Sequence, residues 1–186
     1  MKVTFDKDFP DVAVLAPSSF ADERGSFSEV FNEKEFQGKV EHYRFVQENE
    51  SVSYGTVIRG LHYQLPHPQG KLVRVLSGGI KDLILDLRKG SKTFGKYKFF
   101  ILFHGINWLW IPPGYAHGFI SIAQGGTTKV LYKTTDYYHP ECEQCIRYND
   151  PTLNIPWGED EKRLVISEKD GAGSLFEDAK VYEEWV

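Results

Sequence analysis

Cysteine is scarce in this chain of 186 residues, which has only Cys142 and Cys145, spaced as a single C-x-x-C pair. One such pair supplies two of the four ligands that a structural zinc site needs. No alternation of strand and helix patterns surrounds the pair, as a redox motif of this spacing would require. We therefore expect neither metal binding nor redox chemistry at these two cysteines.

Long apolar runs are also missing. No run exceeds the five residues of Phe99–Phe103, whereas a membrane-spanning helix needs about 20. The segment Met1–Phe20 mixes charged and apolar residues, but a secretory signal has a basic start followed by an apolar block. We expect a cytoplasmic protein without a transmembrane segment.

The sequence has no excess of positive charge. Its 22 Lys and Arg residues stand against 26 Asp and Glu residues, which gives a net charge of -4. A diffuse cationic surface that would hold nucleic acid or an anionic membrane is therefore not available. We expect neither as a partner, and any anionic ligand must meet a local basic site.

Glycine, proline and aromatic residues are plentiful by comparison. The 17 glycines and 9 prolines are spread along the chain and aromatic residues make up 15% of it, a mixture typical of short strands joined by tight turns. Alternation supports this interpretation, because Leu83, Leu85 and Leu87 fall on one side of an extended segment. The pattern predicts a strand there with one face toward the core.

Similar patterns predict strands in further segments, namely Tyr43–Ser53, Val57–Gln64, Lys71–Leu76, Tyr97–Phe103, Gly118–Ile122 and Lys129–Thr135. Many short strands without long amphipathic helices favour a mainly β fold, most simply an antiparallel jelly-roll β-barrel. We expect one domain over residues 1–186, with a barrel core at about 40–150 and a C-terminal segment, 151–186, packed on it. Helices should be short, with one turn at Glu33–Phe36 and the others mainly near the C-terminus.

Two of the six histidines stand in distinctive surroundings. His62 lies within Arg59–Gln64 and His117 within Ile111–Phe119, each on a predicted strand after a turn, so both can face one barrel mouth. For a single histidine, a core position bonded to a backbone carbonyl is the simpler interpretation. Two histidines in such a barrel first suggest a metal-binding cupin.

The metal-binding pattern of a cupin is incomplete in this chain. Its first motif needs a second histidine two residues after the first, where this chain has Gln64, and Leu65–Arg74 contains no acidic residue as a further ligand. The segment around His117 still resembles the second cupin motif. We therefore expect a cupin-type barrel without a metal.

Longer motifs follow one another along nearly the whole chain, at Asp22–Phe27, Gln47–Asn49, Ile58–Gln64, Gln69–Val75, Asp86–Ser91, Trp110–Phe119, Tyr132–Tyr138, Asn149–Pro151 and Ser167–Asp170. These motifs, in this order, resemble those of the dTDP-4-dehydrorhamnose 3,5-epimerase family. Its members are cofactorless, cupin-fold isomerases of nucleotide sugars. The resemblance implies an epimerase of a dTDP-linked 4-keto-6-deoxy sugar that needs no cofactor. Its commonest reaction converts dTDP-4-dehydro-6-deoxy-D-glucose to dTDP-4-dehydro-L-rhamnose.

Inversion of a carbon beside a ketone needs a base on one face, a stabilised enolate, and an acid on the opposite face. Histidine, with a reference pKa of about 6.5, suits the base, and tyrosine, with one of about 10, suits the acid. The resemblance assigns the base to His62, oriented by Asp170, and the acid to Tyr132. It assigns enolate stabilisation to Lys71. Without its motif, Tyr132 would be interpreted as an ordinary core tyrosine.

The resemblance also implies a set of substrate-binding residues: Arg24, Glu29, Gln47, Asn49, Arg59, Lys71, His117, Glu143 and Lys169. Arginine suits a pyrophosphate because its planar guanidinium donates two hydrogen bonds at once. Arg59 and His62 are three residues apart and so lie on opposite faces of a regular strand. They share one site only if Gly60 permits a bulge or if they serve different subunits. The family further implies a homodimer that exchanges N-terminal strands, so that part of each site comes from the neighbour.

Other functions stay open at this point. Family members that invert only C3 use the same base and acid, so the three residues His62, Asp170 and Tyr132 fit a 3-epimerase as well. A metal-dependent cupin would contain stoichiometric transition metal, against which Gln64 argues. A 3,4-ketoisomerase of the same substrate would move the carbonyl group. A non-catalytic binding module would bind dTDP without any turnover.

Overall fold

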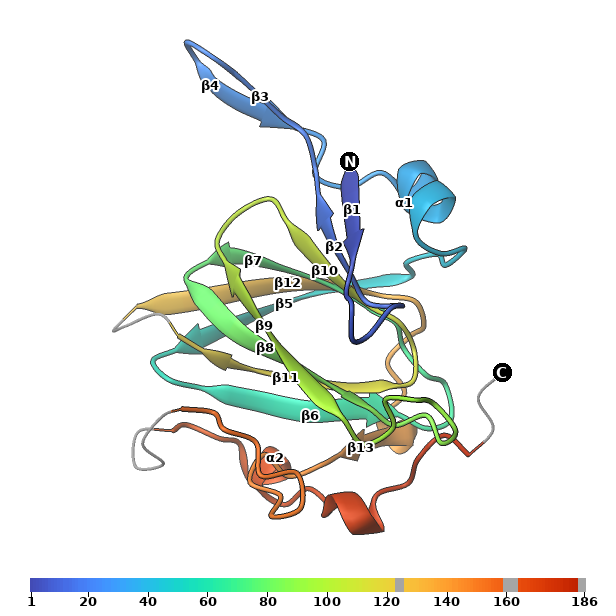
Figure 1. Ribbon diagram of the computed structural model, residues 1–186. Helices are drawn as coiled ribbons and strands as arrows, with labels where there is room; N and C mark the ends of the chain where they lie inside the picture. The colour runs from blue at the N-terminus through green and yellow to red at the C-terminus, as the bar shows by residue number, and fades with distance from the viewer. Residues whose placement is uncertain (123–125, 159–163, 184–186) are drawn as a thin grey trace.

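The computed structural model describes residues 1–122, 126–158 and 164–183, which form two β-sheets facing each other and a separate hairpin (Figure 1). The strands are β1 (Lys2–Phe5), β2 (Ala13–Ala16), β3 (Ser19–Asp22), β4 (Gly25–Ser28), β5 (Gln47–Tyr54), β6 (Ile58–Gln64), β7 (Lys71–Ser77), β8 (Gly79–Asp86), β9 (Tyr97–Phe103), β10 (Trp108–Ile111), β11 (Tyr115–Ser121), β12 (Thr127–Thr134) and β13 (Glu143–Cys145). One sheet has the order β1-β2-β10-β7-β12-β5 and the other β13-β6-β11-β8-β9. All of these neighbouring strands are antiparallel, which confirms the prediction of a mainly β jelly roll.

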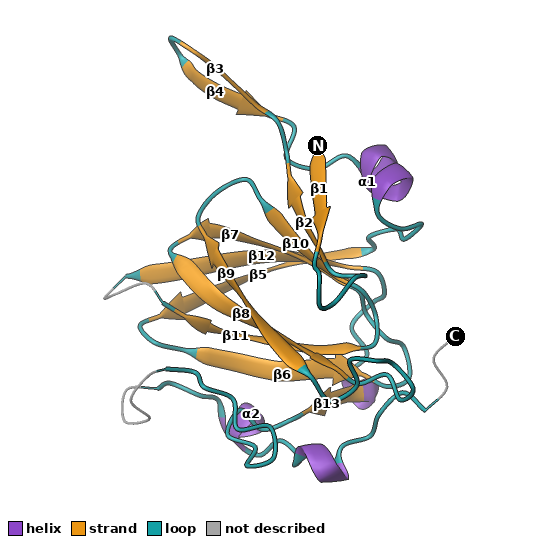
Figure 2. Ribbon diagram, viewed as in Figure 1, coloured by secondary structure: helices purple, strands orange, loops and turns teal. Residues whose placement is uncertain are grey.

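Helices are short and lie outside the sheets (Figure 2). The longest that the structure describes, α1 (Glu33–Lys39), exceeds the single predicted turn. Its first turn is capped by Asn32, whose side chain accepts a hydrogen bond from the Glu35 backbone N–H at 3.2 Å. The others are α2 (Glu168–Gly171) and two 3₁₀ turns, Pro140–Cys142 and Phe176–Asp178. In the described ranges, no helix has the length and apolar character needed to cross a membrane.

The strand that carries Leu83 and Leu85 is buried on both faces, and the prediction of a single core face was wrong. Ile84 points into the barrel, whereas Leu83 and Leu85 belong to a second cluster with Ile155 and Trp157. The chain after β13 therefore covers the outer face of this sheet. Successive side chains of β8 therefore alternate between two apolar clusters, and neither face of the strand is exposed to solvent.

The sequence analysis did not predict strand β10, because its residues show no alternation of apolar and polar side chains. All four of its residues, from Trp108 to Ile111, are buried, since β10 is hydrogen-bonded on one side to β2 and on the other to β7. A short, wholly apolar run does not distinguish a strand from a helix by periodicity. The predicted strand Tyr43–Ser53 also starts later than expected, at Gln47.

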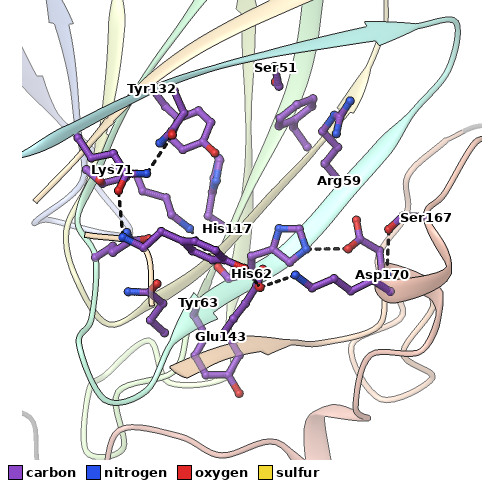
Figure 3. A pocket seen from close by; sticks show the side chains of 18 residues that line it. Ser51, Arg59, His62, Tyr63, Lys71, His117, Tyr132, Glu143, Ser167 and Asp170 are labelled. Atoms are coloured by element: carbon purple, nitrogen blue, oxygen red, sulfur yellow. Dashed lines mark hydrogen bonds and ion pairs between the residues drawn. The ribbon is translucent and has the colours of Figure 1, made fainter. Parts of the chain in front are cut away.

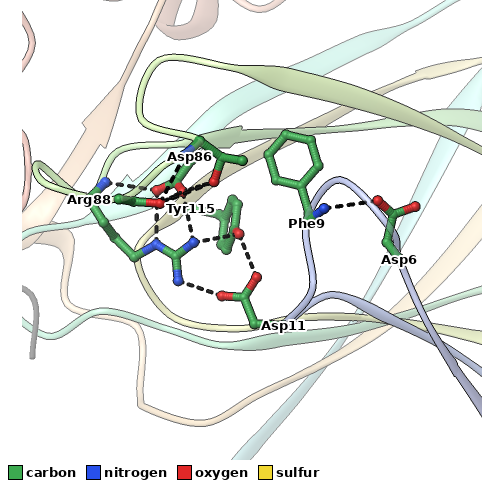
Figure 4. A network of polar contacts seen from close by, with 8 residues as sticks. Asp6, Phe9, Asp11, Asp86, Arg88 and Tyr115 are labelled. Atoms are coloured by element: carbon green, nitrogen blue, oxygen red, sulfur yellow. Dashed lines mark hydrogen bonds and ion pairs between the residues drawn. The ribbon is translucent and has the colours of Figure 1, made fainter.

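A buried network of polar groups fixes the start of the chain to the barrel (Figure 4). The Arg88 guanidinium donates to Asp86 Oδ1 at 2.8 Å and Oδ2 at 2.7 Å, and it also contacts Asp11. The hydroxyl group of Tyr115 donates to Asp11 Oδ1 at 2.7 Å. Burial alone would raise the pKa of the Asp86 carboxyl group, but hydrogen bonds from Arg88 and neighbouring hydroxyl groups lower it.

Replacement of Asp86 should therefore destabilise the fold strongly. We expect Asp86→Ala to lower the free energy of unfolding by about 3–5 kcal/mol, because it leaves the buried charge of Arg88 short of its main partner. The measurement is urea unfolding at neutral pH. Asp8→Ala is the control, because the Asp8 side chain is 71% exposed and its ion pair with Lys98 should contribute less than about 1 kcal/mol. Equal losses in the two variants would contradict this account.

The hairpin β3–β4 projects away from both sheets (Figure 1). Its strands are exposed along almost their whole length, and Phe20 and Phe27 form a cross-strand pair with 67% and 73% of their surface accessible. Arg24 lies at the turn and binds Asp22 in the same hairpin. An exposed pair of phenylalanines on a projecting hairpin is unusual, since exposed apolar patches often mark sites of interaction.

Candidate active site

A pocket of about 430 Å³ opens between the two sheets (Figure 3). It is lined by most of the residues predicted for the site, namely Gln47, Asn49, Arg59, His62, Lys71, His117, Tyr132, Glu143, Lys169 and Asp170. These residues come from six strands and from α2, so the barrel fold brings distant parts of the sequence to one cavity.

His62 and Asp170 form a hydrogen-bonded pair on one wall of the pocket. His62 Nε2 lies 2.7 Å from Asp170 Oδ1, and the second carboxylate oxygen accepts from the Gly60 backbone N–H at 3.1 Å. Asp170 is held at the start of α2, where its own N–H donates to Ser167 Oγ at 3.1 Å. Burial would raise the pKa of Asp170, but the hydrogen bonds from His62, Gly60 and Ser167 lower it. The carboxylate is ionised at neutral pH and can stabilise a protonated His62.

A second histidine and carboxylate pair joins the pocket-lining His117 to Asp82, which is fully buried and does not itself line the pocket. His117 Nε2 is 2.9 Å from Asp82 Oδ2, and both side chains are buried. The other oxygen, Oδ1 of Asp82, has no hydrogen-bond partner among the described residues. Burial raises the pKa of Asp82, while His117 and Lys71 oppose the rise. The sequence analysis missed Asp82, since an acid on the interior side of β8 belongs to no motif.

Lys71 places a buried ammonium group in this part of the pocket. Its Nζ donates to the backbone carbonyl of His62 at 3.1 Å. Burial lowers the pKa of Lys71 to about 8, although Asp82 and Glu143 favour its charged form. A cation with little solvent around it is suited to bind an oxygen atom that gains negative charge.

Tyr132 reaches the pocket from the opposite side. It lies on β12 of the six-stranded sheet, whereas His62 lies on β6 of the five-stranded sheet. Figure 3 shows the two side chains on different walls of the cavity. Burial raises the pKa of the Tyr132 phenol, which keeps its proton in place at neutral pH. The pocket thus offers proton-transfer groups on two sides.

Strand β6 contains the bulge that Arg59 and His62 need in order to share a site. His62 pairs with His117 and Arg59 with Phe119, so three steps along β6 match two steps along β11. Gly60 has a φ of 117°, and a Cβ atom there would lie 2.6 Å from the Gly118 Cα atom. Both Arg59 and His62 line the pocket of one chain.

Polar side chains form the rim of the pocket. Tyr138 donates its hydroxyl hydrogen to Glu143 Oε2 at 2.6 Å, and Lys169 also contacts this carboxylate. Gln47 donates through its amide to Asn49 Oδ1 at 2.9 Å and accepts from the Tyr138 backbone N–H at 3.0 Å. Tyr138 was not singled out from the sequence, although its motif was.

Arg24 and Glu29 are not among the residues that line this pocket. The reason is the direction of the hairpin, which carries Arg24 away from the sheets of its own chain (Figure 1). Within one chain, the pocket therefore lacks two of the predicted binding residues.

Comparison with known proteins gives a consistent result. A family model described as dTDP-4-dehydrorhamnose 3,5-epimerase matches residues 6–178. The chain is 44% identical over 175 residues to the dTDP-4-dehydrorhamnose 3,5-epimerase of Pseudomonas aeruginosa, covering 93% of this chain and 95% of that protein. It is 45% identical over 176 residues to the Neisseria gonorrhoeae protein of the same name, covering 94% of this chain but only 53% of that longer protein.

Among solved structures, the chain resembles the dTDP-6-deoxy-D-glucose-3,5-epimerase of Legionella pneumophila, determined in complex with dTDP-4-keto-L-rhamnose. The TM-score is 0.90 at 38% identity, and the match covers 100% of this chain and 99% of that one. The likeness therefore extends over the whole fold.

Proposed function

Because the chain belongs to the dTDP-4-dehydrorhamnose 3,5-epimerase family, we propose that it inverts C3 and C5 of dTDP-4-dehydro-6-deoxy-D-glucose and yields dTDP-4-dehydro-L-rhamnose. One observation carries the proposal: His62 and Tyr132 enter the same pocket from opposite sheets. An inversion needs such an arrangement, since the proton must leave one face of the carbon and return to the other. The proposed place of action is the cytoplasm.

The first step is removal of a proton by His62 from a carbon beside the ketone. The C–H electron pair becomes part of an enolate, and the negative charge moves to the C4 oxygen. The Asp170 carboxylate stabilises the protonated imidazole. Lys71 supplies the positive charge for the enolate oxygen, which is the interaction that should contribute most to the rate.

The second step is return of a proton by Tyr132 to the opposite face of the same carbon. The phenol suits this step because its raised pKa keeps the proton in place until a strongly basic enolate forms. Solvent then restores the proton of Tyr132 and accepts the one held by His62. The same two residues serve the second carbon, because it flanks the same ketone.

The nucleotide part of the substrate is proposed to lie toward Arg59, Gln47 and Asn49. Arg59 donates to Ser53 Oγ at 3.1 Å and to the Val52 carbonyl at 2.9 Å, which fixes its guanidinium group at the pocket. A fixed arginine loses little side-chain freedom when a pyrophosphate binds.

The test of this function is hydrogen exchange. EDTA-treated enzyme is incubated in D₂O with dTDP-4-dehydro-6-deoxy-D-glucose, and deuterium is located by NMR and mass spectrometry. We expect deuterium at both C3 and C5, because each carbon loses its hydrogen to His62 and receives a new one derived from solvent. Deuterium at C3 alone would identify a 3-epimerase, and no exchange at either carbon would reject an epimerase of this substrate.

We also propose that the active form is a homodimer in which Arg24 and Glu29 complete the pocket of the partner. The exposed Phe20 and Phe27 pair supports this, since a second chain would cover it. The hairpin projects away from both sheets of its own chain, and neither Arg24 nor Glu29 lines the pocket of that chain, which supports it as well. Exposed sheet edges give the two chains a further means of pairing.

Mixing two inactive variants tests the composite site. His62→Asn lacks the base and Arg24→Ala lacks the hairpin arginine, so a heterodimer of the two has one site with both groups intact. We expect the mixture, after exchange of subunits, to recover about a quarter of the wild-type rate at low substrate concentration. Native mass spectrometry must first establish that heterodimers form. Heterodimers that remain as inactive as the parent variants would rule out the shared site.

A further inference from the structure

Two histidines and an aspartate outside the catalytic pairs lie together near the pocket. His67 is in the loop between β6 and β7, and Asp136 and His139 follow β12. One ligand atom from each of the three lies within 4.8 Å of the others, an arrangement named the His67 cluster below. The two imidazole rings are stacked, with centroids 4.4 Å apart and planes inclined by 21°.

Among the described residues, neither imidazole ring of the His67 cluster is held by a short hydrogen bond, whereas Asp136 Oδ1 accepts one from the Tyr137 backbone N–H at 2.8 Å. His67 Nδ1 lies 3.4 Å from Asp136 Oδ2, and His139 Nδ1 lies 3.4 Å from Glu141 Oε1. Both distances are beyond the usual range for a nitrogen–oxygen hydrogen bond. A cation can therefore bind the two imidazoles and Asp136 Oδ2 without breaking strong contacts first.

The backbone beneath the His67 cluster is fixed by two glutamines. The Gln64 side chain donates to the His67 carbonyl at 2.8 Å and accepts from the His139 N–H at 2.7 Å. Gln69 donates through its amide to the Asp136 carbonyl at 2.9 Å. Gln64 is buried, so its amide connects the two histidine-bearing segments from inside the protein. Only side-chain rotations remain to be fixed when a ligand binds, which lowers the entropic cost of binding.

We propose that the His67 cluster binds one divalent transition-metal ion of the Zn²⁺ type, held by His67, His139 and a carboxylate. Imidazole with carboxylate suits Zn²⁺, Ni²⁺ or Cu²⁺ and does not suit Mg²⁺ or Ca²⁺, which prefer oxygen ligands alone. Zinc bonds of about 2.1 Å in a tetrahedron place the ligand atoms about 3.4 Å apart. The His67 side chain is 52% exposed and that of His139 is 31% exposed, so both rings have room to rotate into that spacing. Solvent reaches the site and can complete the coordination.

A competing cluster exists at the catalytic pair and is less suited to a metal. It consists of His62, Cys145 and Asp170, whose ligand atoms also lie within 4.8 Å of one another. His62 and Asp170 are already joined by a 2.7 Å hydrogen bond. Burial raises the pKa of the Cys145 thiol to about 12, so the thiol carries its proton at neutral pH and is a poor ligand. The ion should therefore prefer the His67 cluster.

Isothermal titration with ZnCl₂ tests the proposal on the full-length, untagged protein after EDTA treatment and removal of the chelator. We expect one Zn²⁺ per chain for the wild type. His67→Ala and His139→Ala should each weaken binding at least about tenfold, because each removes one ligand of a small set. His104→Ala is the matched control, since it removes an exposed histidine elsewhere and should bind like the wild type.

A second measurement identifies the ligands directly. Co²⁺ bound to imidazole and carboxylate should show weak visible bands without a thiolate charge-transfer band, and Cys145→Ser should leave the spectrum unchanged. The proposal is overturned if the wild type binds no Zn²⁺ at about 1 mM, or if His67→Ala and His139→Ala bind as the wild type does. It is also overturned if Cys145→Ser is the variant that loses the metal. Circular dichroism of each variant verifies that the fold is intact.

Discussion

His62→Asn is expected to turn over dTDP-4-dehydro-6-deoxy-D-glucose at least about 10³-fold more slowly than the wild type. The substitution removes the only group on its wall of the pocket that is assigned to accept the proton, and it preserves much of the side-chain volume. Exchange of substrate hydrogen with D₂O should be lost to the same extent. The affinity for dTDP should stay unchanged, because His62 has no assigned contact with the nucleotide. NMR of the sugar and calorimetry with dTDP measure these quantities.

Tyr132→Phe is the matched control for this result. Without the phenol the base still works, so hydrogen exchange should persist while formation of inverted product falls. The two variants should therefore differ in the exchange of substrate hydrogen with solvent, although both form less of the inverted product. If His62→Asn retained exchange, the base would have to be another residue. If both variants lost dTDP affinity equally, the site would be placed wrongly.

The second large effect concerns Lys71. Lys71→Met should reduce kcat/KM by about 10²–10³-fold, because the enolate oxygen loses its buried positive charge. Methionine fills a similar volume, so the loss should come from charge and not from a cavity. An unchanged rate in Lys71→Met would exclude the ammonium group from the reaction.

Loss of the Lys71 proton should also lower the kcat/KM of the wild type at alkaline pH. The pKa of Lys71 is about 8, lowered from its ordinary value by burial. In the proposed mechanism the protonated form of Lys71 is the active one, so kcat/KM should be highest below this pKa and fall as the pH rises through it. Lys71→Met should lack this decline, since it has no proton to lose there. A pH–rate profile from about pH 6 to 10 measures both curves.

Alternating apolar residues mark strands directly, which is why the sequence predicted the mainly β fold. Most of the residues that line the pocket were expected instead from the resemblance of their motifs to the epimerase family. Asp82 could not be found this way. Asp82 becomes part of the site only through its hydrogen bond to His117 and its electrostatic interaction with Lys71, which lie on other strands. Interactions between residues far apart in the sequence are not visible in local patterns.

The hairpin shows a different limit of sequence patterns. Its strands are exposed on both faces, so they carry none of the alternation that a core imposes. The sequence predicted a role for Arg24 but not the strands on either side of it. The outer face of β8 is a similar case, since its burial depends on Trp157 and other residues far along the chain.

The bulge at Gly60 also sets the spacing between Arg59 and His62. Because three steps on β6 match two on β11, Arg59 and His62 are separated by about 7 Å along the neighbouring strand and face the same cavity. The spacing between the proposed phosphate-binding group and the proposed base is thus set by the main chain, and substitution of another pocket side chain should leave it unchanged. Ligands with a shorter or longer connection between phosphate and reacting carbon should be rejected by misalignment, even where every polar contact is available. Selection for a new substrate of different length would have to alter the number of residues in β6.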